Sequence, residues 1–224
     1  MSNKLFKLFL LIPFPISKWI YTFIRKYISV DPRIPYFEKI VKYIVKNNIE
    51  GDFLEFGVYR GSSFIEFIKL FERYLKNETI KYYAFDTFEG LPFGEGAKWK
   101  TNDFLVSKKD FKNCLIKNGV DLNKTKIVKG NYLDVLSNEL KKNYTLEKAS
   151  VIHIDCDLYL STKAVLDFID SLLVPGSIII FDEYEMGAWK AEKGEKQAFK
   201  EFKEYKNFEE FDICGISKAF IFKK

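Results

Sequence analysis

The sequence predicts an α/β fold, a doubly wound and mostly parallel seven-stranded sheet with an antiparallel final strand. Strand-like and helix-like segments alternate from Tyr36 onward, which is typical of a parallel sheet with helices on both faces. The runs 151–154 and 177–181 are almost continuously apolar, as expected for strands buried on both faces. Only Cys214–Gly215–Ile216 joins the last two strand-like segments, so we expect these two to pair antiparallel. With 224 residues, of which 47% are hydrophobic, the chain can bury the core of one such domain.

Each element is expected from its apolar spacing and from the residues at its ends. Apolar side chains at helical spacing between Ile40 and Val45 predict a first helix that ends at Asn47–Asn48. A long loop rich in Gly, Pro and Lys covers 87–107. The other expected elements are strands over 52–56, 80–85, 126–129, the residues before Asp155, 177–181, 208–213 and 217–223, and helices over 62–75, 108–118, 161–173 and 194–206.

Carboxylates follow two of the expected buried strands. Asp155 and Asp157 come after one strand, and Asp182 and Glu183 come after the other. Ligands of open α/β sheets bind in the crevice beyond the carboxyl ends of the strands. Four carboxylates in one crevice repel each other, and a hard dication such as Mg²⁺ relieves that repulsion through oxygen ligands. The sequence therefore predicts a divalent-cation site at this edge.

The Cys and His content excludes several other kinds of site. The three cysteines, Cys114, Cys156 and Cys214, are widely spaced and odd in number, so they offer neither a CxxC zinc site nor a disulfide framework. His153 is the only histidine, which leaves little material for a zinc site or a Ser-His-Asp triad. Free cysteines fit a reducing compartment, and we expect a cytoplasmic protein.

Basic residues are in excess only in the N-terminal segment. Residues 1–33 contain six Lys or Arg and one Asp, whereas the rest of the chain contains 30 residues of each sign. A neutral domain lacks the basic surface that nucleic acid requires, so no nucleic-acid partner is expected. We therefore divide the chain into a basic extension, 1–35, and a catalytic domain, 36–224.

The extension contains a predicted basic amphipathic helix between Ile16 and Ile28. The apolar stretch before it is too short to span a bilayer, and no cleavage site of the signal-peptide type follows. Three hypotheses remain: the helix packs on its own domain as a lid, forms an arm across a homodimer, or lies through residues 4–28 on the inner face of the membrane. We expect a homodimer.

The first expected strand leads into a glycine-containing turn. Glu55, Gly57 and Gly61 form E-x-G-x-x-x-G between a strand and a helix, where the backbone can approach a ligand closely. Asp86 ends the second strand, at the position where an acid accepts ribose hydroxyl groups in nucleotide-binding sheets. The glycine-containing turn and Asp86 together favour a cofactor that contains adenosine.

Six sequence blocks between residues 51 and 199 resemble the macrocin and mycinamicin sugar O-methyltransferases. The blocks keep the family's order: FLEFGVYRGSS, FDTFEGLP, VKGNYLDVL, HIDCDLYLST, PGSIIIFDEY and GEKQAF. The resemblance implies a class I methyltransferase fold. It also implies Mg²⁺-dependent transfer of a methyl group from S-adenosylmethionine (SAM) to a hydroxyl group of a small-molecule or glycan acceptor.

The same resemblance implies roles for individual residues. By motif position, Glu55, Gly57 and Ser63 would lie along the methionine part of SAM, Asp86 would hold the ribose, and Gly130 and Asn131 would lie beside the adenine. Gly61, Ser62, Thr87 and Asp155 complete the expected cofactor-binding set. Asp155, Asp182 and Glu183 fall on the family's metal positions, although the family usually has Asp-Asp where this chain has Asp182-Glu183.

Methylation of an alcohol needs a base, because a hydroxyl group holds its proton tightly at neutral pH. Asp157 is the expected catalytic base, since it lies two residues beyond the expected metal ligand Asp155. His153 is the rival candidate, on the same face as Asp155 but deeper in the sheet.

Two other functions fit part of the sequence. Asp155-Cys156-Asp157 is a D-x-D of the kind that holds a metal and a nucleotide sugar in glycosyltransferases, but that function does not explain Glu55 and Asp86. A non-catalytic membrane-peripheral protein on a methyltransferase scaffold is the second alternative.

Overall fold

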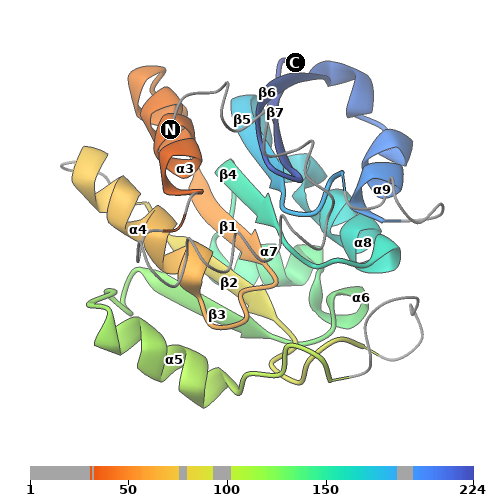
Figure 1. Ribbon diagram of the computed structural model, residues 1–224. Helices are drawn as coiled ribbons and strands as arrows, with labels where there is room; N and C mark the ends of the chain where they lie inside the picture. The colour runs from red at the N-terminus through yellow and green to blue at the C-terminus, as the bar shows by residue number, and fades with distance from the viewer. Residues whose placement is uncertain (1–30, 32, 76–79, 93–101, 186–193) are drawn as a thin grey trace.

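A single seven-stranded sheet forms the centre of the protein, as seen in a computed structural model that describes residues 31, 33–75, 80–92, 102–185 and 194–224 (Figure 1). The strand order is β3-β2-β1-β4-β5-β7-β6. Strands β1 to β5 are parallel, whereas β7 is antiparallel to both β5 and β6. This confirms the expected fold class. The strands are β1 (Asp52–Phe56), β2 (Tyr82–Asp86), β3 (Thr125–Lys129), β4 (Ala149–Ile154), β5 (Leu173–Phe181), β6 (Phe208–Cys214) and β7 (Ser217–Phe222).

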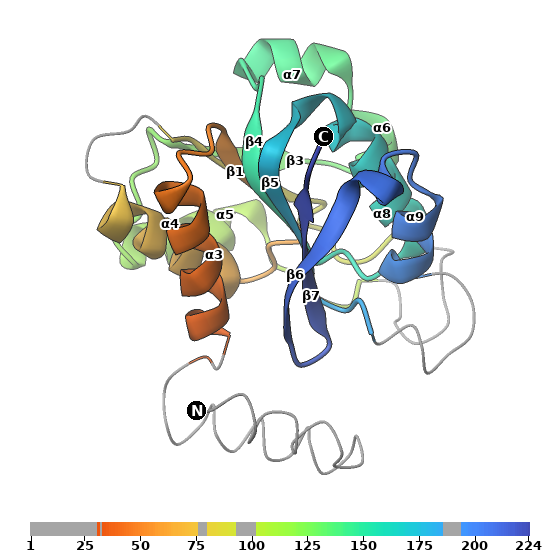
Figure 2. The ribbon, with the colours of Figure 1, turned by 90° about the horizontal axis from the view of Figure 1, so that it is seen from above.

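Helices cover both faces of the sheet, and each face has its own apolar core (Figures 1 and 2). On one face lie α3 (Ile34–Lys46), α4 (Ser62–Tyr74) and α5 (Lys108–Lys117). On the other lie α6 (Tyr132–Val135), α7 (Asn138–Tyr144), α8 (Tyr159–Ile169) and α9 (Glu195–Glu201), with the 3-10 turns η1 (Asp170–Leu172) and η3 (Tyr205–Asn207). The short helices α6 and α7 were not expected from the sequence. Side-chain caps start them, from Asn131 and Ser137 respectively, and neither is long enough to show an apolar period.

Helix α3 is part of the sheet domain. Pro35 stands in its first turn, where the missing N–H costs nothing, and a buried stripe that includes Phe37 and Ile40 packs it against α4. The predicted amphipathic helix between residues 16 and 28 lies outside the described residues. In the described part of the chain, no helix has the length and apolar character needed to cross a bilayer.

The strand order reverses between β1 and β4. The chain moves outward from β1 through β2 to β3, then returns to place β4 on the other side of β1. A crevice opens beyond the carboxyl ends of the strands at such a reversal. Asp86 ends β2 at this edge, and Gly57, Asp155 and Asp182 directly follow β1, β4 and β5.

Candidate functional site

Three potential ligand groups meet at the ends of β4 and β5. His153 pairs in register with Ile180, so Asp155 and Asp182, two residues further along each strand, face the same side of the sheet. Three ligand atoms, one each from His153, Asp155 and Asp182, all lie within 4.8 Å of one another. The structure thus brings together two of the three expected metal ligands and places His153 beside them. Glu183 is not a member of this group.

His153 is completely buried between two carboxylates. Its Nδ1 lies 3.3 Å from Oε2 of Glu55, and its Nε2 lies 3.5 Å from Oδ1 of Asp182. These contacts are ion pairs rather than well-aligned hydrogen bonds, since neither nitrogen has a partner of hydrogen-bond geometry among the described residues. Burial lowers the pKa of His153, but the two carboxylates outweigh it and raise the pKa to about 10. In the metal-free protein the two carboxylates therefore favour the protonated imidazole, which is a poor general base.

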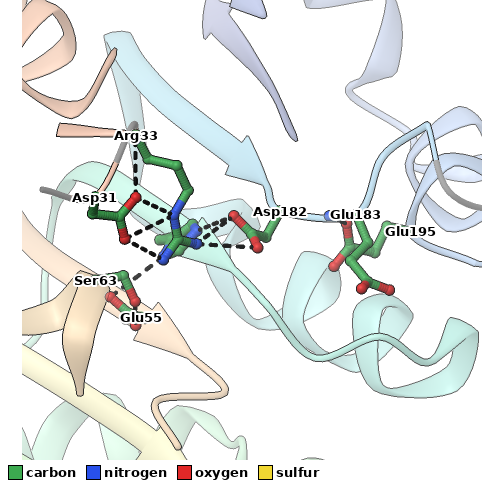
Figure 3. A network of polar contacts seen from close by, with 8 residues as sticks. Asp31, Arg33, Glu55, Ser63, Asp182, Glu183 and Glu195 are labelled. Carbon is green, nitrogen blue, oxygen red and sulfur yellow. Dashed lines mark hydrogen bonds and ion pairs between the residues drawn. The ribbon is translucent and has the colours of Figure 1, made fainter. Parts of the chain in front are cut away.

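Arg33 binds the carboxylate of Asp182 directly. Its Nη1 donates to Oδ1 at 3.0 Å and to Oδ2 at 3.2 Å, while Nε and Nη2 donate to Asp31 (Figure 3). Burial raises the pKa of Asp182, but Arg33 and His153 hold it well below the usual range. Sequence reasoning missed Arg33 because it was counted among the basic residues of the extension. Its position just before the first predicted helix was the available signal.

Glu195 is a second residue that the sequence interpretation did not identify. It begins α9, is 2% exposed, and accepts the backbone N–H of Glu183 through Oε2 at 3.1 Å (Figure 3). Its Oε1 is buried without a hydrogen-bond partner among the described residues. Burial and then the neighbouring Asp155 and Asp157 raise its pKa well above the ordinary value. Its presence in the GEKQAF block was the available signal.

Asp155 and Asp157 are both half-buried. Burial, followed by repulsion from Asp182, raises the pKa of Asp155 well above its usual value. Asp157 is half-buried and lies in a tight turn with φ of 60°, a conformation that is uncommon for residues other than glycine. Residues in this conformation cluster at functional sites, and aspartate adopts it more readily than most other residues. Asp157 also contributes to the repulsion at Asp155 and at Glu195, so it lies near both.

Gly57 lets β1 approach β4 closely. Its φ is 89°, and a Cβ atom built there would lie 1.9 Å from the carbonyl oxygen of Asp155. No side chain fits that space. Gly61 adopts a left-handed conformation, with φ of 77°, at the start of α4, so the E-x-G-x-x-x-G turn has the glycine-dependent geometry that its spacing suggested.

Asp86 organises the loops of the expected cofactor edge. Its Oδ2 accepts the N–H groups of Val58 (3.0 Å) and Tyr59 (3.1 Å), and its Oδ1 accepts that of Phe88 (2.8 Å). A fourth and longer contact, 3.4 Å, comes from the Thr87 hydroxyl group. A carboxylate has about four acceptor directions, and these four contacts use them, with that of the Thr87 hydroxyl group the longest.

The remaining expected cofactor residues lie along or beneath the same edge. Ser62 is exposed at the start of α4, whereas Ser63 is buried and donates to Oε1 of Glu55 at 2.6 Å. Glu55 is itself fully buried, so in this structure it supports His153 and Ser63. The Gly130 N–H donates to the Asp86 carbonyl group at 3.0 Å, which attaches the β3 end to the β2 end, and Asn131 caps α6.

Comparison with solved structures identifies methyltransferases with this fold. CalS11, a calicheamicin methyltransferase, has a TM-score of 0.72 and 22% identity over 98% of this chain and 90% of its own. The O-methyltransferase NovP has a TM-score of 0.71 and 20% identity over 87% and 81%. TomG from Streptomyces achromogenes, an O-methyltransferase involved in tomaymycin synthesis and solved in complex with SAM, has a TM-score of 0.57 and 13% identity over 85% and 80%. At these identities the similarity establishes the class I methyltransferase fold.

The sequence comparisons identify the family. No curated protein matches this sequence significantly. The family model of the macrocin-O-methyltransferases matches residues 26–222, which include every strand of the sheet and all the candidate site residues. The chain therefore belongs to the macrocin-O-methyltransferase (TylF) family.

Proposed function

We propose that this protein transfers a methyl group from SAM to a hydroxyl group of a sugar or glycosylated small molecule in a Mg²⁺-dependent reaction. Family membership supports the O-methyltransferase activity. The observation that carries the proposal is the meeting of Asp155, Asp182 and His153 at the β1/β4 reversal, beside the turn that Gly57 and Asp86 shape. One structural neighbour is a TDP-rhamnose 3'-O-methyltransferase, which favours a sugar acceptor.

The edge formed by β1, β2 and β3 is the proposed SAM site. SAM would supply the methyl group. Gly57, Gly61, Ser62 and Ser63 would line the methionine side, with Glu55 beneath them, while Asp86 and Thr87 would face the ribose. Gly130 and Asn131 would lie beside the adenine. TomG, a related methyltransferase fold solved with SAM, supports SAM as the cofactor.

The carboxylates at β4 and β5 are the proposed cation site. The fit rests on chemistry seen in the structure: oxygen donors of the kind that Mg²⁺ prefers, a raised pKa at Asp155, and the unpartnered Oε1 of buried Glu195 nearby. Asp155 and Asp182 would hold the ion, with Glu183 as the proposed third ligand. A bound Mg²⁺ would act as a Lewis acid that lowers the pKa of the acceptor hydroxyl group.

Asp157 is the proposed base that accepts the hydroxyl proton. It lies two residues beyond Asp155 in a strained turn, and it is half-buried rather than sealed in the core. His153 would instead keep its proton and hold Glu55 and Asp182 in place. We further propose a homodimer, on the sequence expectation alone.

The proposal is tested with purified full-length protein and a nucleotide-linked sugar such as TDP-rhamnose as acceptor. Methyl transfer is expected to stop with a chelator and to return with Mg²⁺. Asp155→Asn is expected to abolish turnover while SAM still binds in calorimetry, whereas Asp157→Asn is expected to keep both ligands and lose about 10²–10⁴-fold in rate. Asp86→Asn is expected to weaken SAM binding.

Two outcomes would contradict the proposal. Full turnover in excess chelator, with no metal detected by elemental analysis, would exclude the metal-dependent mechanism. Binding of nucleotide sugars without binding of SAM would instead support the glycosyltransferase alternative.

A further inference from the structure

We propose that Arg33 is a positioning residue of the candidate cation site, which holds the carboxylate of Asp182 toward His153 and Asp155. The inference rests on the proposed metal site. It brings into that site a residue from just before α3, outside the sheet, that the strand-end motifs do not include.

The guanidinium group of Arg33 is itself fixed at several points. Nε donates to both oxygens of Asp31 at 3.3 and 3.4 Å, and Nη2 donates to Oδ2 of Asp31 at 3.0 Å. The guanidinium carbon lies 5.4 Å from the ring centre of Phe37 on α3. These contacts leave Nη1 directed at Asp182, where it donates to both oxygens at 3.0 and 3.2 Å (Figure 3).

Asp182 needs such a support because one of its neighbours, the carboxylate of Asp155, repels it. Asp155 faces the same side of the sheet two residues past the paired His153 and Ile180, so two carboxylates lie close together. Their repulsion favours rotation of Asp182 away from the site. The side chains of Arg33 and Asp182 are only 15% and 19% exposed, so solvent weakens their attraction less than that of a surface ion pair.

Arg33 also places a positive charge beside the expected dication. This charge repels the ion and would weaken metal binding, whereas correct orientation of Asp182 would strengthen it. If charge repulsion dominated, removal of Arg33 would tighten metal binding. We infer that orientation dominates, because a single nitrogen spans both oxygens of Asp182 and Asp31 offsets part of the guanidinium charge. Partners that orient metal ligands typically change metal affinity by about 10–100-fold.

The experiment measures Mn²⁺ binding to the full-length protein by electron paramagnetic resonance, without any assay of turnover. Arg33→Ala is expected to weaken Mn²⁺ affinity by about tenfold or more, and Arg33→Lys is expected to restore part of it. Lys39→Ala is the matched control, since Lys39 lies on α3, the helix that Arg33 precedes, and pairs with Asp212 rather than with Asp182. Its Mn²⁺ affinity is expected to equal that of the wild type.

A double-mutant cycle separates positioning from a general loss of structure. In an Asp182→Asn background, Arg33→Ala is expected to have little further effect, because Arg33 acts through Asp182. Thermal melts of each variant identify any that fail to fold. If Arg33→Ala fails to fold, the Mn²⁺ affinity of Arg33→Lys is used to test the proposal. Unchanged or tighter Mn²⁺ binding by Arg33→Ala overturns the positioning role alone. Absence of Mn²⁺ binding by the wild type overturns this role together with the proposed metal site.

Discussion

Charge balance at single residues dominates the candidate site. His153 and Arg33 provide positive charge among Glu55, Asp182 and Asp155. The pKa values of His153, Asp155 and Asp182 depend on these charged neighbours. The desolvation of any one of these groups would be costly alone. Together they form a network in which the protonation of His153 is the most accessible observable, because the chain has no other histidine.

We predict that His153 stays protonated at neutral pH in the metal-free protein. Its pKa rises from the ordinary 6.5 to about 10, so the protonated form favours the folded state. The stabilisation is therefore complete below pH 6.5 and is lost as the pH rises through about 10. Nitrogen-detected NMR of the single imidazole is expected to show an imidazolium at pH 8 in chelator.

The urea-unfolded chain provides the control, since its histidine is expected to titrate near 6.5. A folded protein whose imidazole titrates at that same pH would show that the two carboxylates do not act as described.

At the scale of elements, the site depends on how closely β1 and β4 approach. The two strands are neighbours in the sheet although almost a hundred residues separate them in the chain, and Gly57 faces the Asp155 carbonyl group where β4 ends. The metal-ligand side and the cofactor side of the crevice therefore share one backbone contact.

We predict that Gly57→Ala destabilises the protein far more than Gly119→Ala does. Both glycines have positive φ, 89° and 78°, but an added Cβ meets backbone at 1.9 Å at Gly57 and nothing within 4 Å at Gly119. The left-handed conformation alone costs an alanine about 1–2 kcal/mol, which is the loss expected for Gly119→Ala. The backbone clash is expected to take Gly57→Ala beyond about 4 kcal/mol. Urea unfolding measures both variants, and equal losses would contradict the clash.

At the scale of the whole molecule, the chain combines a neutral catalytic domain with a basic N-terminal segment. Arg33 forms ion pairs with Asp31 and Asp182. The other basic residues of that segment are Lys4, Lys7, Lys18, Arg25 and Lys26. Their structural role lies outside the described residues, so the membrane hypothesis remains a prediction.

We predict that the full-length protein sediments with anionic lipid vesicles at low salt and that added salt releases it. Each Lys or Arg near an anionic surface contributes about 1 kcal/mol, and salt screens that attraction. A chain that begins at Asp31 keeps Arg33 and α3 and is expected to remain in the supernatant. If the full-length protein does not sediment with these vesicles at low salt, the packing or dimer-arm hypothesis is favoured instead.

The sequence by itself determined the number and order of the strands, their alternation with helices and the placement of acids at strand ends. Strand β5, predicted over 177–181, begins earlier, at Leu173. Strand β1 was predicted over residues 52–56, as observed, because buried strands of a parallel sheet are short apolar runs with sharp polar ends. The same local logic placed Gly57, Asp86, Asp155 and Asp182 at one edge, since the carboxyl ends of parallel strands coincide.

Only the tertiary structure decided which charges meet. Arg33 and Asp182 are 149 residues apart in the chain, and no local pattern relates them. The charge state of His153 likewise depends on burial and on two partners from other strand ends, and the role of Glu195 depends on α9 packing its first residue against the Glu183 backbone. Periodicity reports which face a side chain occupies, whereas electrostatic partners are set by distances that exist only after the sheet and its helices have packed.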